Sequence, residues 1–434
     1  MNNIVKIVFI LLTVSLCSIL WANETPEIPA TSGNTTLLFS NQKAPEELKQ
    51  FINSVVTKHP RLLQERARLE VAQANLRAAD NAIYNPELEI DSENTDIRTS
   101  YLQLSQTIDI GNKRGARTSV SQAELLQANS EYELAIQQLV FDLLSSLAQQ
   151  HTSNEIYLLV EQNLELMKDF ASISEQRHNA GDLSQVELNL ARLAYSEAIM
   201  TYAQAGADAA FTKERLRALL GHIPQNIPEL PDTLPDARLP DNQDKFLLNL
   251  PAVRIEQAKV INARKTVALR QSEKSWDPTI SLRGGKEDKE TLAGITLSIP
   301  LNIRNSFSAE VQAAQQLLVQ SEYRAQQFYR NQRAIVSTST QRYALLQQAW
   351  KNWRVSGKTS IQQQLKLIKR LWKLGDMSTT DYLVQLKQTI DTQTAGLELR
   401  GKLWQSAFEW MKTSASIINW LNINLNENKL ETSK

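Results

Sequence analysis

The chain has one cysteine in 434 residues, and that residue, Cys17, lies close to the N-terminus. A mature protein without this end has no thiol, so neither a disulfide nor a thiolate metal ligand is expected. The four histidines are widely separated and lack the spacing of metal ligands. No nucleophile stands beside a candidate base. The sequence therefore predicts no metal site, no cofactor and no enzymatic activity.

The chain also lacks an excess of charge of either sign, and it has few aromatic residues. Lys and Arg number 47, as do Asp and Glu, so the formal net charge is zero, and aromatic residues make up 6%. A nucleic-acid-binding surface needs a basic excess, so no nucleic-acid partner is expected. Apolar runs long enough for a membrane-spanning helix are absent after residue 22, so any membrane association must use another structure.

The first 22 residues contain the longest apolar run. Lys6 precedes an apolar stretch over residues 7–20, and Ala22 supplies a small residue at the expected cleavage point. This order is typical of a signal peptide, so residues 1–22 are predicted to be one and the protein to be exported. The residues before Cys17 also resemble a bacterial lipoprotein box, apart from the bulky Leu16, which leaves lipidation open.

Proline is missing from two long stretches, residues 87–223 and 301–434. Because proline in a helix interior costs about 3 kcal/mol, these stretches permit very long helices. Leu139, Leu143 and Leu147 recur every fourth residue, a spacing typical of helices that pack in coiled-coil fashion. Between the two stretches, the proline-rich residues 224–242 are predicted to be a linker.

The chain repeats itself with an offset of about 192 residues. The residues around Pro86 return around Pro278, and those around Gly181 return around Gly375. Both glycines are predicted to form tight turns between antiparallel helices, because glycine readily adopts the left-handed conformation. The predicted organisation is a first repeat over residues 23–223, a second repeat over residues 243–420 and a polar tail over residues 421–434.

Each repeat also holds two short segments in which apolar and polar residues alternate. Alternation predicts strands with one apolar face. The strands are expected at residues 86–93, 101–110, 279–284 and 292–300. The acidic residues on one face of the first strand are Glu87, Glu89, Asp91 and Glu93. Four strands cannot close a barrel, which needs at least eight, so they are either shared with other copies of the chain or part of an ordinary soluble sheet.

The duplicated order of helix, two strands, helix, turn and helix resembles the TolC family of outer-membrane efflux proteins over essentially the whole mature chain. Residues 109–117 are most similar to the CzcC-type branch of that family, which serves export of heavy-metal cations. The resemblance implies a mainly α fold with a small β part, assembled as a homotrimer. Three copies would close a twelve-stranded β-barrel in the outer membrane and an α-helical tunnel across the periplasm.

This resemblance implies a channel that passively conducts substrates, expected to be divalent heavy-metal cations, to the outside. The implied partners are a periplasmic adaptor, an inner-membrane RND-type pump, outer-membrane lipid and two further copies of the chain. Two alternatives stay open. One is a TolC-like exit duct for organic toxins, drugs or secreted protein, and the other is a soluble periplasmic coiled-coil scaffold.

The resemblance also assigns roles to particular positions. The adaptor-binding tips are expected to comprise Ala180, Gly181, Leu183, Ser184, Leu374, Gly375, Met377 and Ser378. A gate or constriction is expected at Glu187 and Asp381, each a short distance beyond a turn glycine, together with Trp372. The four acidic residues of the first strand would face the lumen and attract cations.

The basic run at residues 111–114 also suggests a phosphate-binding site. It lacks the spacing of a phosphate-binding P-loop, however. Asn112 is instead the expected N-cap of the long helix that follows. Lys113, Arg114 and Arg117 are expected near lipid headgroups at the inner edge of the membrane.

Overall fold

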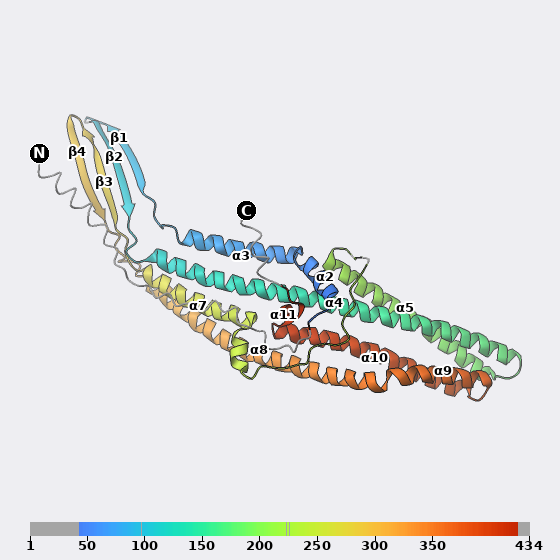
Figure 1. Ribbon diagram of the computed structural model, residues 1–434. Coiled ribbons are helices and arrows are strands. Elements are labelled where there is room, and N and C mark those ends of the chain that lie inside the picture. Colours follow the sequence, from blue (N-terminus) through green and yellow to red (C-terminus); the bar gives the residue numbers. More distant parts are fainter. Residues whose placement is uncertain (1–42, 97, 223, 225, 424–434) are drawn as a thin grey trace. The chain divides into compact units, whose positions relative to one another are not determined.

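The computed structural model describes residues 43–423 except residues 97, 223 and 225 (Figure 1). The predicted signal peptide, Cys17 and most of the predicted polar tail lie outside these residues. The helices are α2 (Glu46–Val56), α3 (Pro60–Ala79), α4 (Lys113–Asn179), α5 (Gln185–Leu220), α6 (Gln243–Leu248), α7 (Pro251–Ser272), α8 (Ser308–Ser356), α9 (Lys358–Leu374), α10 (Thr379–Thr413) and α11 (Ile417–Leu421). The strands are β1 (Glu87–Asn94), β2 (Arg98–Thr107), β3 (Thr279–Glu287) and β4 (Glu290–Ser298).

The two halves of the chain fold alike. Each has a helix (α3 or α7), a strand pair, a long helix (α4 or α8) and an antiparallel partner (α5 or α10). Helix α4 runs through 67 residues without a break, as the absence of proline permits. Its counterpart is divided into α8 and α9 at Gly357. There the Trp353 ring fills the space that a Cβ on Gly357 or on Gly396 of α10 would need.

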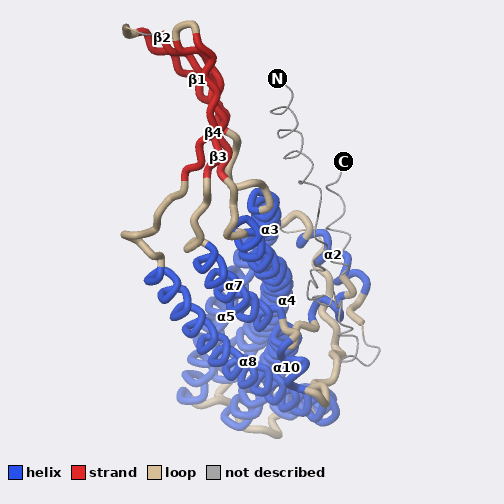
Figure 2. The backbone as a smooth tube through the Cα atoms, turned by 90° about the vertical axis from the view of Figure 1, so that its left-hand side faces the viewer, coloured by secondary structure: helices blue, strands red, loops and turns tan. Residues whose placement is uncertain are grey.

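The four strands form one antiparallel sheet in the order β1-β2-β3-β4 (Figure 2). Leu104 of β2 pairs with Leu88 of β1 on one side and with Leu282 of β3 on the other. Strand β3 continues to Glu287, beyond the predicted end, because residues 284–285 keep pairing with β2. Within the described part of the chain, β1 and β4 each have one unpaired edge. The mainly α fold with four strands is therefore as predicted.

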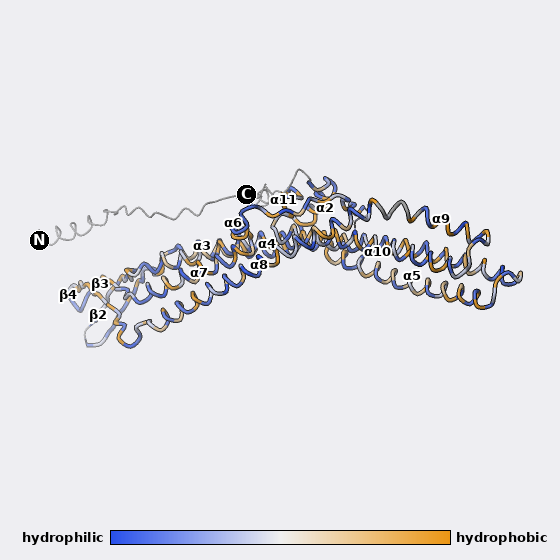
Figure 3. Tube along the Cα trace, turned by 90° about the horizontal axis from the view of Figure 1, so that it is seen from below, coloured by the Kyte–Doolittle hydropathy of each residue, from blue (hydrophilic) through white to orange (hydrophobic). Residues whose placement is uncertain are grey.

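Helix α4 packs against α3, α5, α7 and α10, whereas α8 packs against α7 and α10. The larger buried cluster, which includes Leu143 and Trp404, joins α4 to α10, α2 and α11. A smaller cluster around Phe170 and Trp372 joins α4 to α9, α10 and α5. Hydrophobic and hydrophilic residues alternate along these helices (Figure 3). None of the described helices is both long and apolar enough to cross a membrane.

The proline-rich segment between the two halves packs against the helices. Leu230 is buried, and the Trp404 indole N–H donates a hydrogen bond to the carbonyl of Pro231 at 3.0 Å. The Tyr343 hydroxyl donates to the carbonyl of Pro235. The described residues of this segment form neither helix nor strand up to the start of α6, yet their contacts fix them to α8 and α10.

Candidate functional site

One face of the sheet carries the predicted acidic residues. All of them lie at alternate positions of β1, and we call the face that they share the polar face: Glu87, Glu89, Asp91 and Glu93. The Gln103 amide donates to Glu89 Oε2 at 3.0 Å, and the Tyr101 hydroxyl donates to Asp91 Oδ2 at 2.9 Å. Hydroxyl pairs continue the polar face onto β3, namely Ser105 with Ser281 and Thr107 with Thr279. Among the described residues, no three or more His, Cys, Asp or Glu side chains form a group that could hold a metal ion.

Arg283 of β3 lies on the same polar face and was not predicted. It is paired in register with Gln103, and its guanidinium carbon lies 4.9 Å from the centroid of the Tyr101 ring. The side chain is exposed, and within the described chain no carboxylate forms an ion pair with it. The alternation of polar and apolar residues from position 279 onward was the signal that could have placed it on this face.

The opposite face of the sheet is apolar and uncovered. Its most exposed side chains are Ile295, Ile90 and Leu88, with 78%, 75% and 65% of their surface accessible. The other large apolar members of this face are Leu102, Leu104, Ile280, Leu282 and Leu297. A contiguous exposed apolar surface marks a membrane or protein interface. The sheet thus presents one side suited to water and one suited to an apolar environment.

Asp109 caps the start of α4. Its carboxylate oxygens accept hydrogen bonds from the backbone N–H groups of Lys113 and Arg114 at 2.9 and 2.8 Å. Asn112 occupies the N-cap position of α4, as predicted, but its backbone is left-handed, with φ of 52°, and its side chain makes no capping hydrogen bond. The expected capping by this side chain is therefore wrong. That side chain instead packs against Gly115.

The basic residues at the start of α4 bind other parts of the chain. Arg117 donates hydrogen bonds to carbonyls at the end of α3 and just beyond it, including that of Asn81 at 2.9 Å. Lys113 Nζ lies 2.7 Å from Asp277 Oδ2, which also accepts a hydrogen bond from the Tyr84 hydroxyl at 2.6 Å. The Asp277 side chain is 5% exposed. Its hydrogen bond with Tyr84 raises the pKa of that phenol to about 12.

These contacts form a junction between the sheet and the helices. Tyr84 precedes β1, Asp277 precedes β3, and Lys113 is the first residue of α4. One buried carboxylate therefore holds both strand pairs to the longest helix. Proximity of the basic residues to lipid headgroups stays a prediction.

The two predicted turns share one local geometry. Gly181 has a φ of 87°, and the N–H of Asp182 donates to the carbonyl of Arg177 at 2.8 Å. Gly375 and its neighbours repeat this arrangement, with φ of 83° and the equivalent hydrogen bond at 3.0 Å. This is the Schellman motif, which ends a helix with a glycine in the left-handed conformation.

The predicted tip residues differ in exposure. The exposed ones are Ala180, Gly181, Ser184, Leu374, Gly375 and Ser378. Met377 is half-buried, and Leu183 is buried with 7% of its surface accessible. Val186, which was not predicted, is 69% exposed next to this group. A partner at the tips would therefore meet the glycines, the serines, Leu374 and Val186, whereas Leu183 packs inside the chain.

The two predicted gate carboxylates each bond to the serine three residues before them. The hydroxyl and backbone N–H of Ser184 donate to Glu187 Oε2 at 2.8 and 3.1 Å, and the Glu187 N–H donates to the Ser184 hydroxyl at 3.2 Å. Asp381 accepts from the Ser378 hydroxyl at 2.7 Å and donates its N–H to that oxygen at 3.1 Å. The hydrogen bonds from Ser184 lower the pKa of Glu187. Glu187 is therefore ionised at neutral pH.

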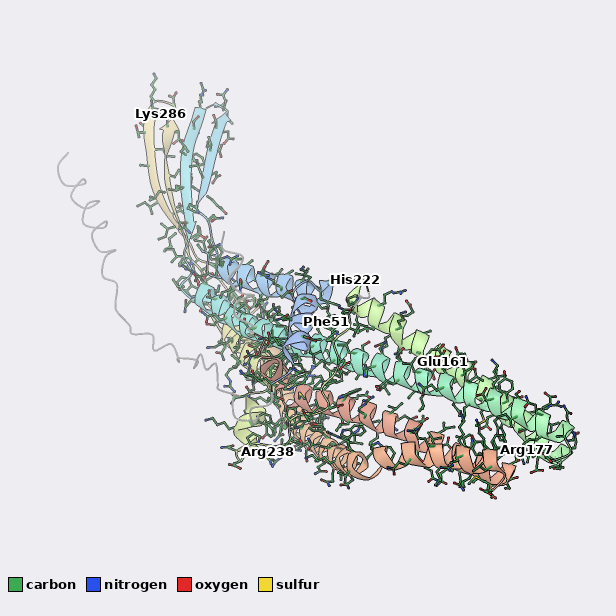
Figure 4. All side chains as sticks on the ribbon, turned by 45° about the vertical axis from the view of Figure 1, so that its right-hand side comes forward. Phe51, Glu161, Arg177, His222, Arg238 and Lys286 are labelled. Carbon is green, nitrogen blue, oxygen red and sulfur yellow. The ribbon has the colours of Figure 1, made fainter. Side chains whose placement is uncertain are left out.

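Trp372, the third predicted gate residue, is buried among aromatic rings. It stacks on Tyr382 at 5.0 Å and contacts Phe170 at 4.8 Å, measured between ring centroids. Its indole N–H has no hydrogen-bond partner within the described part of the chain, so it is not bonded to either gate carboxylate. The guanidinium of Arg177, near the end of α4 in Figure 4, lies 5.9 Å from its ring. These rings come from α4, α9 and α10, and they join the two halves of the chain near the turns.

Comparison with known proteins gives one family match, to the outer membrane efflux protein family over residues 51–222. The cobalt-zinc-cadmium resistance protein CzcC of Cupriavidus metallidurans is 27% identical over 260 residues. That match covers 56% of this chain and 60% of CzcC. The chain thus spans less than two thirds of this curated relative.

Solved structures of outer-membrane channels are similar in fold. CusC superposes with a TM-score of 0.72 and 14% identity, covering 87% of this chain and 93% of CusC. The CmeC channel of Campylobacter jejuni superposes with a TM-score of 0.71 and 14% identity, covering 89% of this chain and 94% of CmeC. At these identities the likeness concerns the fold, which is that of TolC-like channels.

Proposed function

We propose that this chain, whose residues 51–222 are an outer membrane efflux protein domain, forms the outer-membrane exit channel of a tripartite efflux pump. The fold and the family match indicate an outer-membrane protein with a helical part in the periplasm. The finer proposal is that the channel passively conducts divalent heavy-metal cations delivered by a periplasmic adaptor and an inner-membrane pump.

The observation that carries this proposal is the two-sided, four-stranded sheet. One side is acidic and polar, and the other exposes eight large apolar side chains. Four strands with two free edges cannot span a bilayer alone, because every backbone polar group must be paired there. Three copies joined edge to edge would supply twelve strands, with the apolar sides against lipid and the polar sides around a water-filled lumen.

Divalent cations are the proposed substrate for two reasons. CzcC, a relative over 60% of its length, is by name a cobalt-zinc-cadmium resistance protein. The polar face of β1 also places four carboxylates in line, and rings of acidic side chains favour cations in a pore. The exposed serines, glycines and Leu374 of the turns are the proposed docking site of the adaptor, and Glu187 and Asp381 the proposed constriction.

The proposal is tested on the full chain expressed with its N-terminal segment and extracted from outer membranes in mild detergent. Native mass spectrometry should show a trimer, and planar bilayers containing it should conduct with cations favoured over anions. Deleting the gene should sensitise the host to Zn²⁺, Co²⁺ or Cd²⁺. A soluble monomer or dimer absent from the membrane fraction would contradict the channel, whereas sensitisation to organic toxins alone would contradict the metal substrate.

A further inference from the structure

We propose that Arg283 determines cation selectivity by limiting how tightly divalent cations are held on the polar face of the sheet. The inference rests on the proposed function, because Arg283 acts on permeating ions only if the polar face lines the lumen. It adds a specificity-determining residue to a face on which the sequence predicted only the four acidic residues of the first strand.

Arg283 is the one basic residue at the strand positions of the polar face. The acidic residues at those positions are Glu87, Glu89, Asp91, Glu93, Glu287 and Glu290. The other basic residues in the strands, Arg98 and Lys286, occupy positions of the opposite parity and so belong to the apolar face. A single cation per chain is therefore placed within an acidic surface.

The position of Arg283 is fixed by its neighbours. Its guanidinium stacks on the Tyr101 ring at 4.9 Å, and the Tyr101 hydroxyl is itself bonded to Asp91 at 2.9 Å. On its other side Arg283 pairs with Gly294 of β4. The space beside Gly294 is open, since a Cβ added there would meet no atom within 4 Å. The cation is thus held in place by an aromatic ring and is open to water, and among the described residues no carboxylate forms an ion pair with it.

The effect on ions follows from distance and valence. Adjacent strands lie about 4.8 Å apart, so Glu89, two strands away in the same row, is about 10 Å from Arg283 along the sheet. This is close to the Debye length of about 8 Å at physiological ionic strength. A fixed positive charge at this range repels a divalent ion twice as strongly as a monovalent one. Because conduction requires that bound ions also leave, Arg283 favours release of divalent cations from the wall.

The test uses the full-length channel in planar bilayers, with Arg283→Gln as the variant and Lys286→Gln as its matched control. Lys286 lies in the same strand near the end of the sheet (Figure 4) but on the other face. Arg283→Gln should increase the permeability of K⁺ relative to Cl⁻. It should also lower the ZnCl₂ concentration that halves the K⁺ current by about three- to tenfold, since three copies lose a charge each. Lys286→Gln should behave like the wild type. Arg283→Lys, which keeps the positive charge, should require the same ZnCl₂ concentration as the wild type to halve the K⁺ current.

Native mass spectrometry first establishes that each variant is a trimer. If wild-type trimers conduct but Arg283→Gln leaves selectivity and Zn²⁺ block unchanged, the role of Arg283 is refuted while the channel stands. Equal shifts in both glutamine variants would show a long-range effect of net charge, which also refutes a specific role. If wild-type protein conducts no ions, the channel function itself fails and the inference fails with it.

Discussion

Single residues at the turns cap a helix and also affect the ionisation of a neighbouring carboxylate. Ser184 bonds to Glu187 through its hydroxyl and its backbone N–H, and these bonds favour the ionised carboxylate. The pKa of Glu187 in the folded protein is therefore lower than its ordinary value of 4.5. Such a group stabilises the folded state above the pKa of the unfolded chain. That stabilisation is lost as the pH falls through the lower folded pKa.

The carboxylates and their serines can be tested separately. Glu187→Gln with Asp381→Asn should raise the resting conductance of the channel, because it removes the proposed charges and keeps the side-chain shapes. Ser184→Ala with Ser378→Ala should leave the conductance low while lowering stability by about 1 kcal/mol per cap. Bilayer currents and thermal unfolding of the detergent-solubilised trimer measure the two effects.

The pH dependence provides an internal check on the same residues. The hydrogen bonds from Ser184 lower the pKa of Glu187, so wild-type resting conductance should stay constant from pH 7 to 5 and rise only at lower pH. A rise already at pH 6 would show that another group controls the gate. Equal conductance in the wild type and the carboxylate variant would remove the constriction assignment.

At the scale of whole elements, helix α4 shows what a local pattern can predict. The lack of proline and the leucine spacing predicted a long helix, and α4 is one. Asn112 is at its N-cap position as predicted, but the capping side chain is that of Asp109, because Asn112 adopts a left-handed backbone and Asp109 reaches the free N–H groups. The partners of Arg117 and Lys113 lie in α3 and before β3, so they depend on tertiary packing that spacing along the chain does not reveal.

The contacts of Trp372 illustrate the same limit. The resemblance implied a role for this residue at the gate, which stays a prediction. The structure buries it between Phe170 of α4 and Tyr382 of α10, two helices distant in sequence.

The strands show the same contrast between local pattern and tertiary contact. The alternation of β1 was sufficient to predict its acidic face. The stacking of Arg283 on Tyr101 depends on the pairing of β2 with β3, and the pattern of a single strand does not contain that register.

The junction of sheet and helices depends on the buried pair of Lys113 and Asp277, and its strength can be measured. Asp277→Asn should destabilise the protein by about 3 kcal/mol, because it leaves the ammonium of Lys113 buried without its counter-charge. Arg114→Gln is the matched control: its ion pair with Asp80 is exposed on both sides, and its loss should cost less than about 1 kcal/mol. Thermal unfolding in detergent compares the two variants.

Limited proteolysis locates the effect of these substitutions. In Asp277→Asn, cleavage should appear in the chain between α3 and β1, because Tyr84 loses part of its anchor there. If both variants unfold alike and neither is cleaved in that segment, the buried pair does not hold the sheet to the helices.

At the scale of the whole molecule, the duplicated halves together form a sheet that is suited to assembly with further copies. The family match ends at residue 222, yet the second half repeats the order of helix, strand pair and long helix. Each half contributes one strand pair, and the two pairs meet through β2 and β3 in a single sheet. The sheet remains incomplete, because its apolar side is uncovered and its outer edges are unpaired within the described chain. In the proposed barrel, further copies would pair the free edges and lipid would cover the apolar side.

Substitutions at two adjacent residues of β4 distinguish a membrane-facing sheet from a soluble one. Ile295 belongs to the apolar face and Thr296 to the polar face, and both are exposed. In a barrel, Ile295→Asp places a charge in the membrane hydrocarbon beside each of three subunits, at a cost below the roughly 2–4 kcal/mol of a Lys or Arg at the bilayer midplane. Thr296→Asp places the same charge in water. The first variant should therefore lose trimers from the outer membrane, and the second should assemble normally, as measured by fractionation and native mass spectrometry. In a soluble periplasmic scaffold both charges would face water and the two variants would behave alike, so equal recovery of both would refute the barrel.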